Sequence, residues 1–209
     1  MKPPSSRRAL AALLAIVLHA SFSAGTSQAA GFGAFFEYGR DSITTNGTFE
    51  VLTSATGIPL SAFDRNSFGV GLATDTNLAR NKLFNNRFDI GFHASQFANA
   101  AADSGVGLVV NNAFGFGLYR RKTVRLWFGP AVRVDADWYD YGLVDVQVGW
   151  GPQVGFNVHL GENLTSTLTF AYNYKWGWFL DGSGANLEYN DNFLGAGLTF
   201  FFRTSGDQY

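Results

Sequence analysis

The strongest constraint on the fold of this chain is an alternation of apolar and polar residues with a period of two. Between residues 144 and 159 the even positions are apolar from Val144 to Val158, whereas the odd positions hold only Asp, Gln, Gly, Asn and His. An α-helix repeats every 3.6 residues and cannot sort this pattern onto two faces, but a β-strand does so directly. Residues 106–118 and 124–138 repeat the alternation. The pattern therefore predicts an all-β fold.

The same template predicts eight strands along the chain. They are expected at residues 31–41, 67–78, 83–97, 105–119, 123–138, 143–159, 164–179 and 192–203. Short turns such as Arg120-Arg121-Lys122 join several of them, and short connections favour antiparallel neighbours. The long segment 42–66 contains Asn46-Gly47, which can form a hairpin turn. If that hairpin entered the wall, the sheet would have ten strands.

Composition decides what the apolar face of the strands contacts. Hydrophobic residues make up 46% of the chain, yet the mean hydropathy is +0.01 and only 15% of the residues are charged. The polar face carries mainly glycine, which weakens an exposed strand but fits the narrow interior of a closed barrel. The opposite face then contacts lipid, and strands of about 9–11 residues are long enough to cross a bilayer. The expected fold is a closed antiparallel up-and-down transmembrane β-barrel.

The first 29 residues have the organisation of a signal peptide for export. Residues 1–8 carry three positive charges, residues 9–22 form an apolar run too short to span a bilayer as a helix, and Ser27-Gln28-Ala29 places small residues where a signal peptidase reads. We expect cleavage after Ala29. The remainder, residues 30–209, is expected to be a single barrel domain with a long extracellular first loop at about 42–66.

Loop lengths and aromatic residues indicate how the barrel is oriented. The expected connections at 42–66, 98–104, 139–142 and 180–191 are mostly longer than those at 79–82, 120–122 and 160–163, and outer-membrane barrels have longer loops outside. Aromatic residues are expected at the outer rim at Tyr38, Trp138, Tyr139, Tyr174, Trp176 and Trp178. The inner rim is expected to carry Phe32, Phe84, Phe116, Phe200 and Phe202.

With this signal peptide, strand count, alternation and loop asymmetry, residues 31–203 resemble the small eight-stranded outer-membrane barrels, the group that includes OmpX and the OmpA transmembrane domain. The resemblance implies a Gram-negative outer-membrane location, with membrane lipid and lipopolysaccharide as surroundings. It also implies the barrel assembly machinery as a partner during insertion, through an aromatic signal at Phe202 or Tyr209. A pI near 6.3 offers no basic surface for nucleic acid. The sequence does not identify an extracellular partner.

Charged residues at inward positions predict a polar network in the lumen. Its expected members are Glu37, Arg87, Asp89, His93, Arg125, Arg133, Asp135, Asp137, Asp145 and Lys175. Because buried charges need partners, we expect ion pairs, with acidic residues toward a solvated outer mouth and basic residues toward the inner end. Clustered carboxylates attract cations such as calcium, but no loop has the spacing of a calcium site. No metal and no cofactor are expected.

The interior of an eight-stranded barrel is just wide enough for side chains to fill, so we expect a mostly plugged lumen and a structural or surface-interaction role. The inward glycines leave room for water, which keeps open the alternative of a narrow, porin-like channel for ions or small solutes. For a surface role, the candidate contact residues of the first loop are Phe49, Val51, Leu52, Ile58, Leu60 and Phe63.

One short motif suggests an enzyme. His93-Ala94-Ser95 resembles the His-x-Ser of the PagL-type lipid A deacylases of the outer membrane, which implies an esterase using His93 to activate Ser95. However, Gln96 stands where that family has Asn, the segment lies in the third strand rather than late in the chain, and both side chains are expected to face the lumen. We therefore expect no catalytic residues and a histidine paired with Asp89 or another carboxylate.

Overall fold

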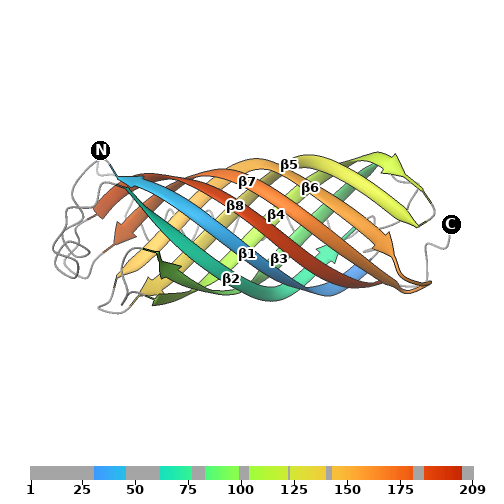
Figure 1. Cartoon of the computed structure of the whole chain (residues 1–209), viewed down its shortest axis with the longest axis horizontal. Helices are drawn as coiled ribbons and strands as arrows, with labels where there is room; N and C mark the ends of the chain where they lie inside the picture. The colour runs from blue at the N-terminus through green and yellow to red at the C-terminus, as the bar shows by residue number, and fades with distance from the viewer. Residues whose placement is uncertain are drawn as a thin grey trace, which may run out of the picture.

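The computed structural model describes residues 31–45, 62–76, 83–98, 104–121, 123–139, 143–180 and 186–203. They form eight antiparallel strands that close into one barrel (Figure 1). The strands are β1 (Gly31–Thr45), β2 (Ala62–Asp75), β3 (Phe84–Phe97), β4 (Ser104–Arg120), β5 (Val124–Tyr139), β6 (Val144–His159), β7 (Leu164–Leu180) and β8 (Asn186–Arg203). No helix in these ranges is long and apolar enough to cross a membrane.

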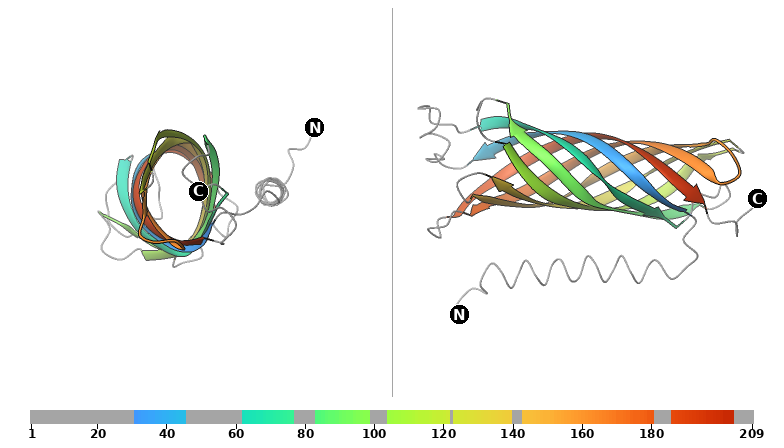
Figure 2. Two further views of the ribbon diagram at one scale, coloured as in Figure 1. Left: turned by 90° about the vertical axis from the view of Figure 1, so that its right-hand side faces the viewer. Right: turned by 90° about the horizontal axis from the view of Figure 1, so that it is seen from below.

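Each strand pairs with its neighbour in the sequence, and β1 closes the barrel by pairing with β8 (Figure 2). β1 pairs directly with β2 from Gly31↔Asp75 to Thr44↔Ala62, so no further strand lies between them. The prediction of an eight-stranded closed barrel is therefore confirmed, and the ten-stranded alternative is wrong. Closure satisfies the backbone groups that an open sheet would leave unpaired at its edges.

The alternation places apolar side chains outside and polar ones inside. Phe92, Phe68 and Val106 are among the most exposed residues of the outer wall, whereas most charged residues at the odd-numbered inward positions are buried. This is the reverse of a water-soluble domain and the arrangement that hydrocarbon requires.

We call the end where β1 begins and β8 ends the inner end of the barrel. The opposite end, where β1 ends and β2 begins, is the outer end.

Three strands extend further toward the outer end than the sequence pattern predicted. β1 continues through 42–45, β2 begins at Ala62, and β8 begins at Asn186, so the predicted loops at 42–66 and 180–191 are shorter. The pattern failed there because the apolar residues change from the outward to the inward positions. Ile43, Phe63 and Tyr189 point inward, and polar residues point outward. Residues 46–61, and the expected signal peptide at 1–29, lie outside the described residues.

Several inward glycines do not leave the free space in the lumen that the sequence suggested, because large side chains from neighbouring strands occupy the space above them. A Cβ atom added to Gly155 would lie 2.1 Å from the Trp127 ring, and one added to Gly177 would lie 2.0 Å from the Tyr189 ring. Gly39 and Gly195 accommodate the ring of Phe193 in the same way. Glycine in this barrel therefore makes a densely filled interior possible.

Candidate functional site

A cluster of buried side chains, which we call the aromatic layer, lies in the lumen at the outer ends of the described strands. It consists of Ile43, Phe63, Phe97, Tyr139, Leu143, Phe179 and Tyr189. The rings of Phe179 and Tyr189 stack with centroids 4.7 Å apart, and those of Phe97 and Tyr139 stack at 5.1 Å. The outermost described part of the lumen is thus apolar, and the prediction of a solvated acidic mouth is wrong, because Asp135, Asp137 and Asp145 are buried.

Two residues of this layer were assigned elsewhere by the sequence. Phe63 was expected in a surface-contact loop, but it lies in β2 with its side chain in the lumen. Tyr139 was expected in the outer aromatic rim, but it points inward and is 7% exposed. Both follow from strands that run past their predicted limits. The other candidate contact residues lie outside the described residues: Phe49, Val51, Leu52, Ile58 and Leu60.

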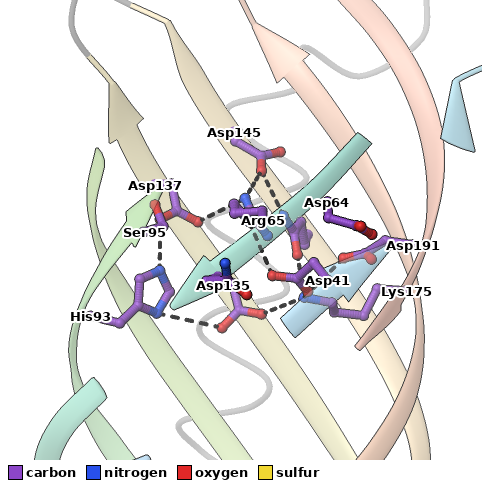
Figure 3. Close-up of polar contacts among 12 residues, drawn as sticks. Asp41, Asp64, Arg65, His93, Ser95, Asp135, Asp137, Asp145, Lys175 and Asp191 are labelled. Atoms are coloured by element: carbon purple, nitrogen blue, oxygen red, sulfur yellow. Dashed lines mark hydrogen bonds and ion pairs between the residues drawn. The ribbon is translucent and has the colours of Figure 1, made fainter. Parts of the chain in front are cut away.

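Arg65 lies directly beneath the aromatic layer and connects three carboxylates (Figure 3). Its Nε donates to Asp41 Oδ2 at 3.0 Å, and its Nη1 donates to Asp145 Oδ2 at 2.7 Å and lies 3.4 Å from Asp137 Oδ2. The same Nη1 donates to Tyr139 Oη at 2.8 Å, which ties the layer above to the charges below. The side chains of Arg65 and its three carboxylate partners are 0–2% exposed.

Lys175 is the second buried cation, and it contacts carboxylates from three other strands. Its Nζ lies 2.5 Å from Asp41 Oδ1, 3.1 Å from Asp191 Oδ2 and 3.2 Å from Asp135 Oδ2 (Figure 3). It also donates to the side-chain oxygen of Gln147. Asp41 accepts from both Arg65 and Lys175, so the two cations belong to one connected network.

Arg133 extends this network toward the middle of the barrel. It pairs with Glu37 at 2.7 Å and with Asp135 at 2.9 Å, and its guanidinium lies 4.1 Å from the centroid of the Phe193 ring. We call the connected set the charge network. Its members are Glu37, Asp41, Arg65, His93, Arg133, Asp135, Asp137, Asp145, Lys175 and Asp191. Six carboxylates face three permanent cations, so the network is acidic.

The structure arranges His93 and Ser95 around a shared carboxylate. His93 Nε2 lies 2.7 Å from Asp137 Oδ1, and Ser95 Oγ donates to the same oxygen at 2.9 Å (Figure 3). A serine nucleophile needs the histidine nitrogen, rather than a carboxylate, as the acceptor of its proton. Both side chains lie in the lumen, where the sequence placed them. The partner of His93 is Asp137, because Asp89 pairs with Arg87 at 2.9 Å instead.

Of the ten residues expected in one lumen network, the structure joins seven in the charge network and places three apart. Arg87 and Asp89 form a separate pair nearer the inner end, and Arg125 contacts Asn85 lower still at 3.3 Å. The predicted network did not include Asp41, the last residue of a predicted strand, or Arg65 and Asp191, which fell outside the predicted strands. Continuing the odd-numbered inward positions of β1 and β8 would have found Asp41 and Asp191.

We expect Gly107→Ala to break the contact between His93 and Asp137. The added Cβ would lie 2.5 Å from His93 Nε2 and 2.7 Å from the backbone oxygen of Ala136, which cannot move away easily. Crowding of this kind costs about 1–3 kcal/mol of the free energy of unfolding, measurable by denaturant titration in lipid vesicles. Gly69→Ala is the matched control, because Gly69 flanks His93 on its other side with the nearest atoms 3.6 Å away. Equal losses in the two variants would contradict the prediction.

No group of three or more His, Cys, Asp or Glu side chains in the described ranges is arranged to hold a metal ion. The acidic residues of the charge network are instead oriented toward Arg65, Arg133 and Lys175. The arrangement cross-links strands: Arg65 on β2 is joined to β1, β5 and β6, and Lys175 on β7 is joined to β1, β5 and β8. Its evident physical effect is to fix the barrel wall from within.

Comparison with known proteins yields no family model and no curated protein that matches this sequence. Among solved structures, the neisserial surface protein NspA has a TM-score of 0.48 at 9% identity over 83% of this chain and 97% of that one. The outer membrane protein OprG from Pseudomonas aeruginosa also has a TM-score of 0.48 at 9% identity, over 85% and 98% of the two chains. From its own wall, polar inside and apolar outside, this chain has the organisation of a small eight-stranded outer-membrane barrel.

Proposed function

We propose that this protein is a sealed structural barrel of the bacterial outer membrane, with a surface-interaction role and no conducting lumen. The observation that carries the proposal is the aromatic layer, which fills the outer end of the lumen with seven packed side chains. An eight-stranded barrel has little interior space to begin with, and bulky side chains crossing it leave no continuous aqueous path.

Further side chains fill the lumen below that layer. The charge network comes next, followed by an apolar cluster of Phe35, Ala73, Val109 and Phe201. Asn111 spans from β4 toward β6, because its side-chain nitrogen donates to both Asp89 and Gln153. Trp127 packs with Ala113 and Ala131 nearer the inner end. This succession of filled levels supports a plugged barrel over the porin-like alternative.

The proposal predicts negligible ion conductance. Purified full-length protein reconstituted in planar lipid bilayers is expected to show no stable steps of porin size, with a porin purified in the same detergent as the positive control. Stable channels in the wild-type protein would refute a sealed barrel.

The shared contact of His93 and Ser95 with Asp137 supports a role in the wall rather than in ester hydrolysis. Thin-layer chromatography of lipid A from cells with and without the protein separates these alternatives. We expect identical acylation patterns, and the same patterns for His93→Gln and Ser95→Ala. Loss of one acyl chain in cells with the wild-type protein, restored by either substitution, would establish the esterase.

The surface role is supported by the sequence of the first loop, whose apolar residues are unusual for a solvated segment. It is tested by replacing Phe49, Leu52, Ile58 and Leu60 together with serine and measuring how much of the protein binds to vesicles that contain lipopolysaccharide. We expect the variant to bind less than the wild-type protein, although its free energy of unfolding is unchanged. Equal binding of the two proteins would show that these residues do not contribute to the interaction.

A further inference from the structure

The outer wall is not uniform around the barrel near its outer end. On β8, β1 and β2 the outward side chains are polar, and we call this the polar outer face: Arg40, Ser42, Asp64, Asn66, Asn190 and Asn192. On β4 to β7 the outward side chains near the outer end are apolar or aromatic, except Ser104 at the first residue of β4. We call this the apolar outer face: Val106, Trp138, Val144, Trp176 and Trp178.

The two faces lie at the same height along the barrel. A ring of outward phenylalanines marks the inner end and includes the cross-strand pairs Phe32↔Phe202 and Phe84↔Phe116. Ser42 stands ten residues along β1 from Phe32, and Val106 stands ten residues along β4 from Phe116. Strands of one barrel share a common tilt, so equal numbers of residues give equal heights. The difference between the faces is therefore one of chemistry and not of position.

The apolar part of the wall has different heights on the two sides. A tilted strand rises about 2.5 Å per residue along the membrane normal. On β1 the outward residues are apolar from Phe32 to Tyr38, about 15 Å, whereas on β6 they are apolar from Val144 to Val158, about 35 Å. The apolar band of an outer-membrane barrel is about 25 Å tall. A bilayer of uniform thickness therefore fits neither side.

Tilting the barrel does not remove this mismatch. A tilt that moves β6 further into the membrane would push the inner end of β6 out of the hydrocarbon on the other side. The outward residues at that end would then be expected to be polar. The outward residues there are Phe156 and Val158, which are apolar. Because β6 is apolar along its whole outer side, the thickness of the lipid must differ between the two sides.

Aromatic residues mark the boundary at two heights. Tyrosine and tryptophan gather where hydrocarbon meets headgroups. The Tyr38 hydroxyl donates to Asn66 Oδ1 at 3.1 Å, and the Tyr172 hydroxyl donates to Asn192 Oδ1 at 2.8 Å. Both tyrosines therefore lie at the lower edge of the polar outer face. On the other side Trp138 and Trp178 stand near the strand ends, about 13 Å higher.

The polar outer face already satisfies many of its own polar groups. Arg40 pairs with Asp64 at 2.7 Å, and Ser42 donates to the other oxygen of Asp64 at 2.9 Å. The Arg40 side chain is 59% exposed and its charge is balanced by Asp64. A surface with internal pairs and balanced charge needs only a hydrated polar layer around it, not a protein of matching charge. Lipid headgroups supply such a layer.

We propose that the polar outer face contacts the headgroup layer of the outer leaflet, which descends there by about 13 Å relative to the apolar outer face, so that the barrel keeps the bilayer thinner on one side. The inference rests on the proposed membrane location. It adds that the protein shapes the lipid around it. The partner of the polar outer face is a lipid surface.

Site-directed spin labelling tests this directly, because the chain has no cysteine and each introduced cysteine is labelled alone. The full-length variants Ser42→Cys, Val106→Cys and Val70→Cys carry the nitroxide in dimyristoylphosphatidylcholine vesicles. Collisions with oxygen report hydrocarbon, and collisions with a water-soluble nickel chelate report the polar layer. Val70 is the control, since it faces outward on β2 below the polar outer face.

We expect the ratio of oxygen to nickel collisions to be several-fold higher at position 106 than at position 42, although both stand at one height, and to be high at position 70. Equal ratios at 42 and 106 would overturn the asymmetry. Low collision rates with both reagents at 42 would show a protein covering the polar outer face and would also overturn the proposal. A nickel-dominated signal at 70 would refute membrane insertion itself and thereby separate that failure from the other two.

Discussion

Arg65→Met is expected to lower the free energy of unfolding of the barrel by about 3–5 kcal/mol, the usual cost of leaving buried charge without its partner. Arg65 is bound to Asp41 and Asp145 and lies beside Asp137, and none of these side chains is more than 2% exposed. Methionine keeps most of the length of the side chain and removes the charge. Urea unfolding in lipid vesicles, followed by circular dichroism, measures the change.

Arg40→Met is the matched control for this prediction. Arg40 lies 2.7 Å from Asp64, the same separation as Arg65 from Asp145, but its side chain is 59% exposed. Exposed ion pairs contribute little to stability because solvent screens them, so we expect a much smaller loss than for Arg65→Met. A similar loss in the two variants would mean that burial of the Arg65 contacts adds nothing to stability.

Trp127→Ala is expected to have a comparably large effect at the inner end, about 3–5 kcal/mol, because it empties the largest fully buried side chain of the lumen. The ring lies over Gly115 and Gly155, which have no side chains that could fill the space. Its Nε1 donates to Asn157 at 3.0 Å, and that amide oxygen would lose its partner. Denaturant titration in vesicles again measures the loss.

Two controls separate volume from hydrogen bonding at this position. Trp127→Phe keeps most of the ring and removes the bond to Asn157, so we expect a loss of about 1–2 kcal/mol. Trp150→Ala removes a tryptophan from the lipid-facing wall, where lipid chains fill the space, and we expect a smaller loss than for Trp127→Ala. If Trp150→Ala were the more damaging, the filled lumen would not be the main source of stability.

The alternation of β6 was the clearest signal for the barrel wall, because every even residue from 144 to 158 is apolar and every odd residue from 145 to 159 is glycine or polar. The same template missed the outer parts of β1, β2 and β8, where Ile43, Phe63 and Tyr189 point inward. A template that assigns apolar residues to lipid fails where the barrel uses them to close its lumen. The sequence does not mark the residue at which that change occurs.

The charge network was predicted in type and only partly in membership. Residues on well-defined strands, such as His93, Asp135 and Lys175, were found because their parity placed them inside. Arg65 was missed because it fell in a predicted loop. The pairing of His93 with Asp137 rather than Asp89 depends on how β3 to β5 are offset along one another, and alternation alone carries no information about offset.

The ion pairs also bear on the order of folding. The hydrogen-bonded seam between β1 and β8 joins residues as distant in the sequence as Gly31 and Arg203, so it forms only after the intervening chain is in place. Asp41 and Asp191 lie on the two sides of that seam and share Lys175. In an unclosed intermediate Lys175 would lack at least one of these partners. The contact of Lys175 with Asp41 therefore forms only in the closed ring, and its contribution to stability is expected to appear in the unfolding rate rather than in the rate of folding.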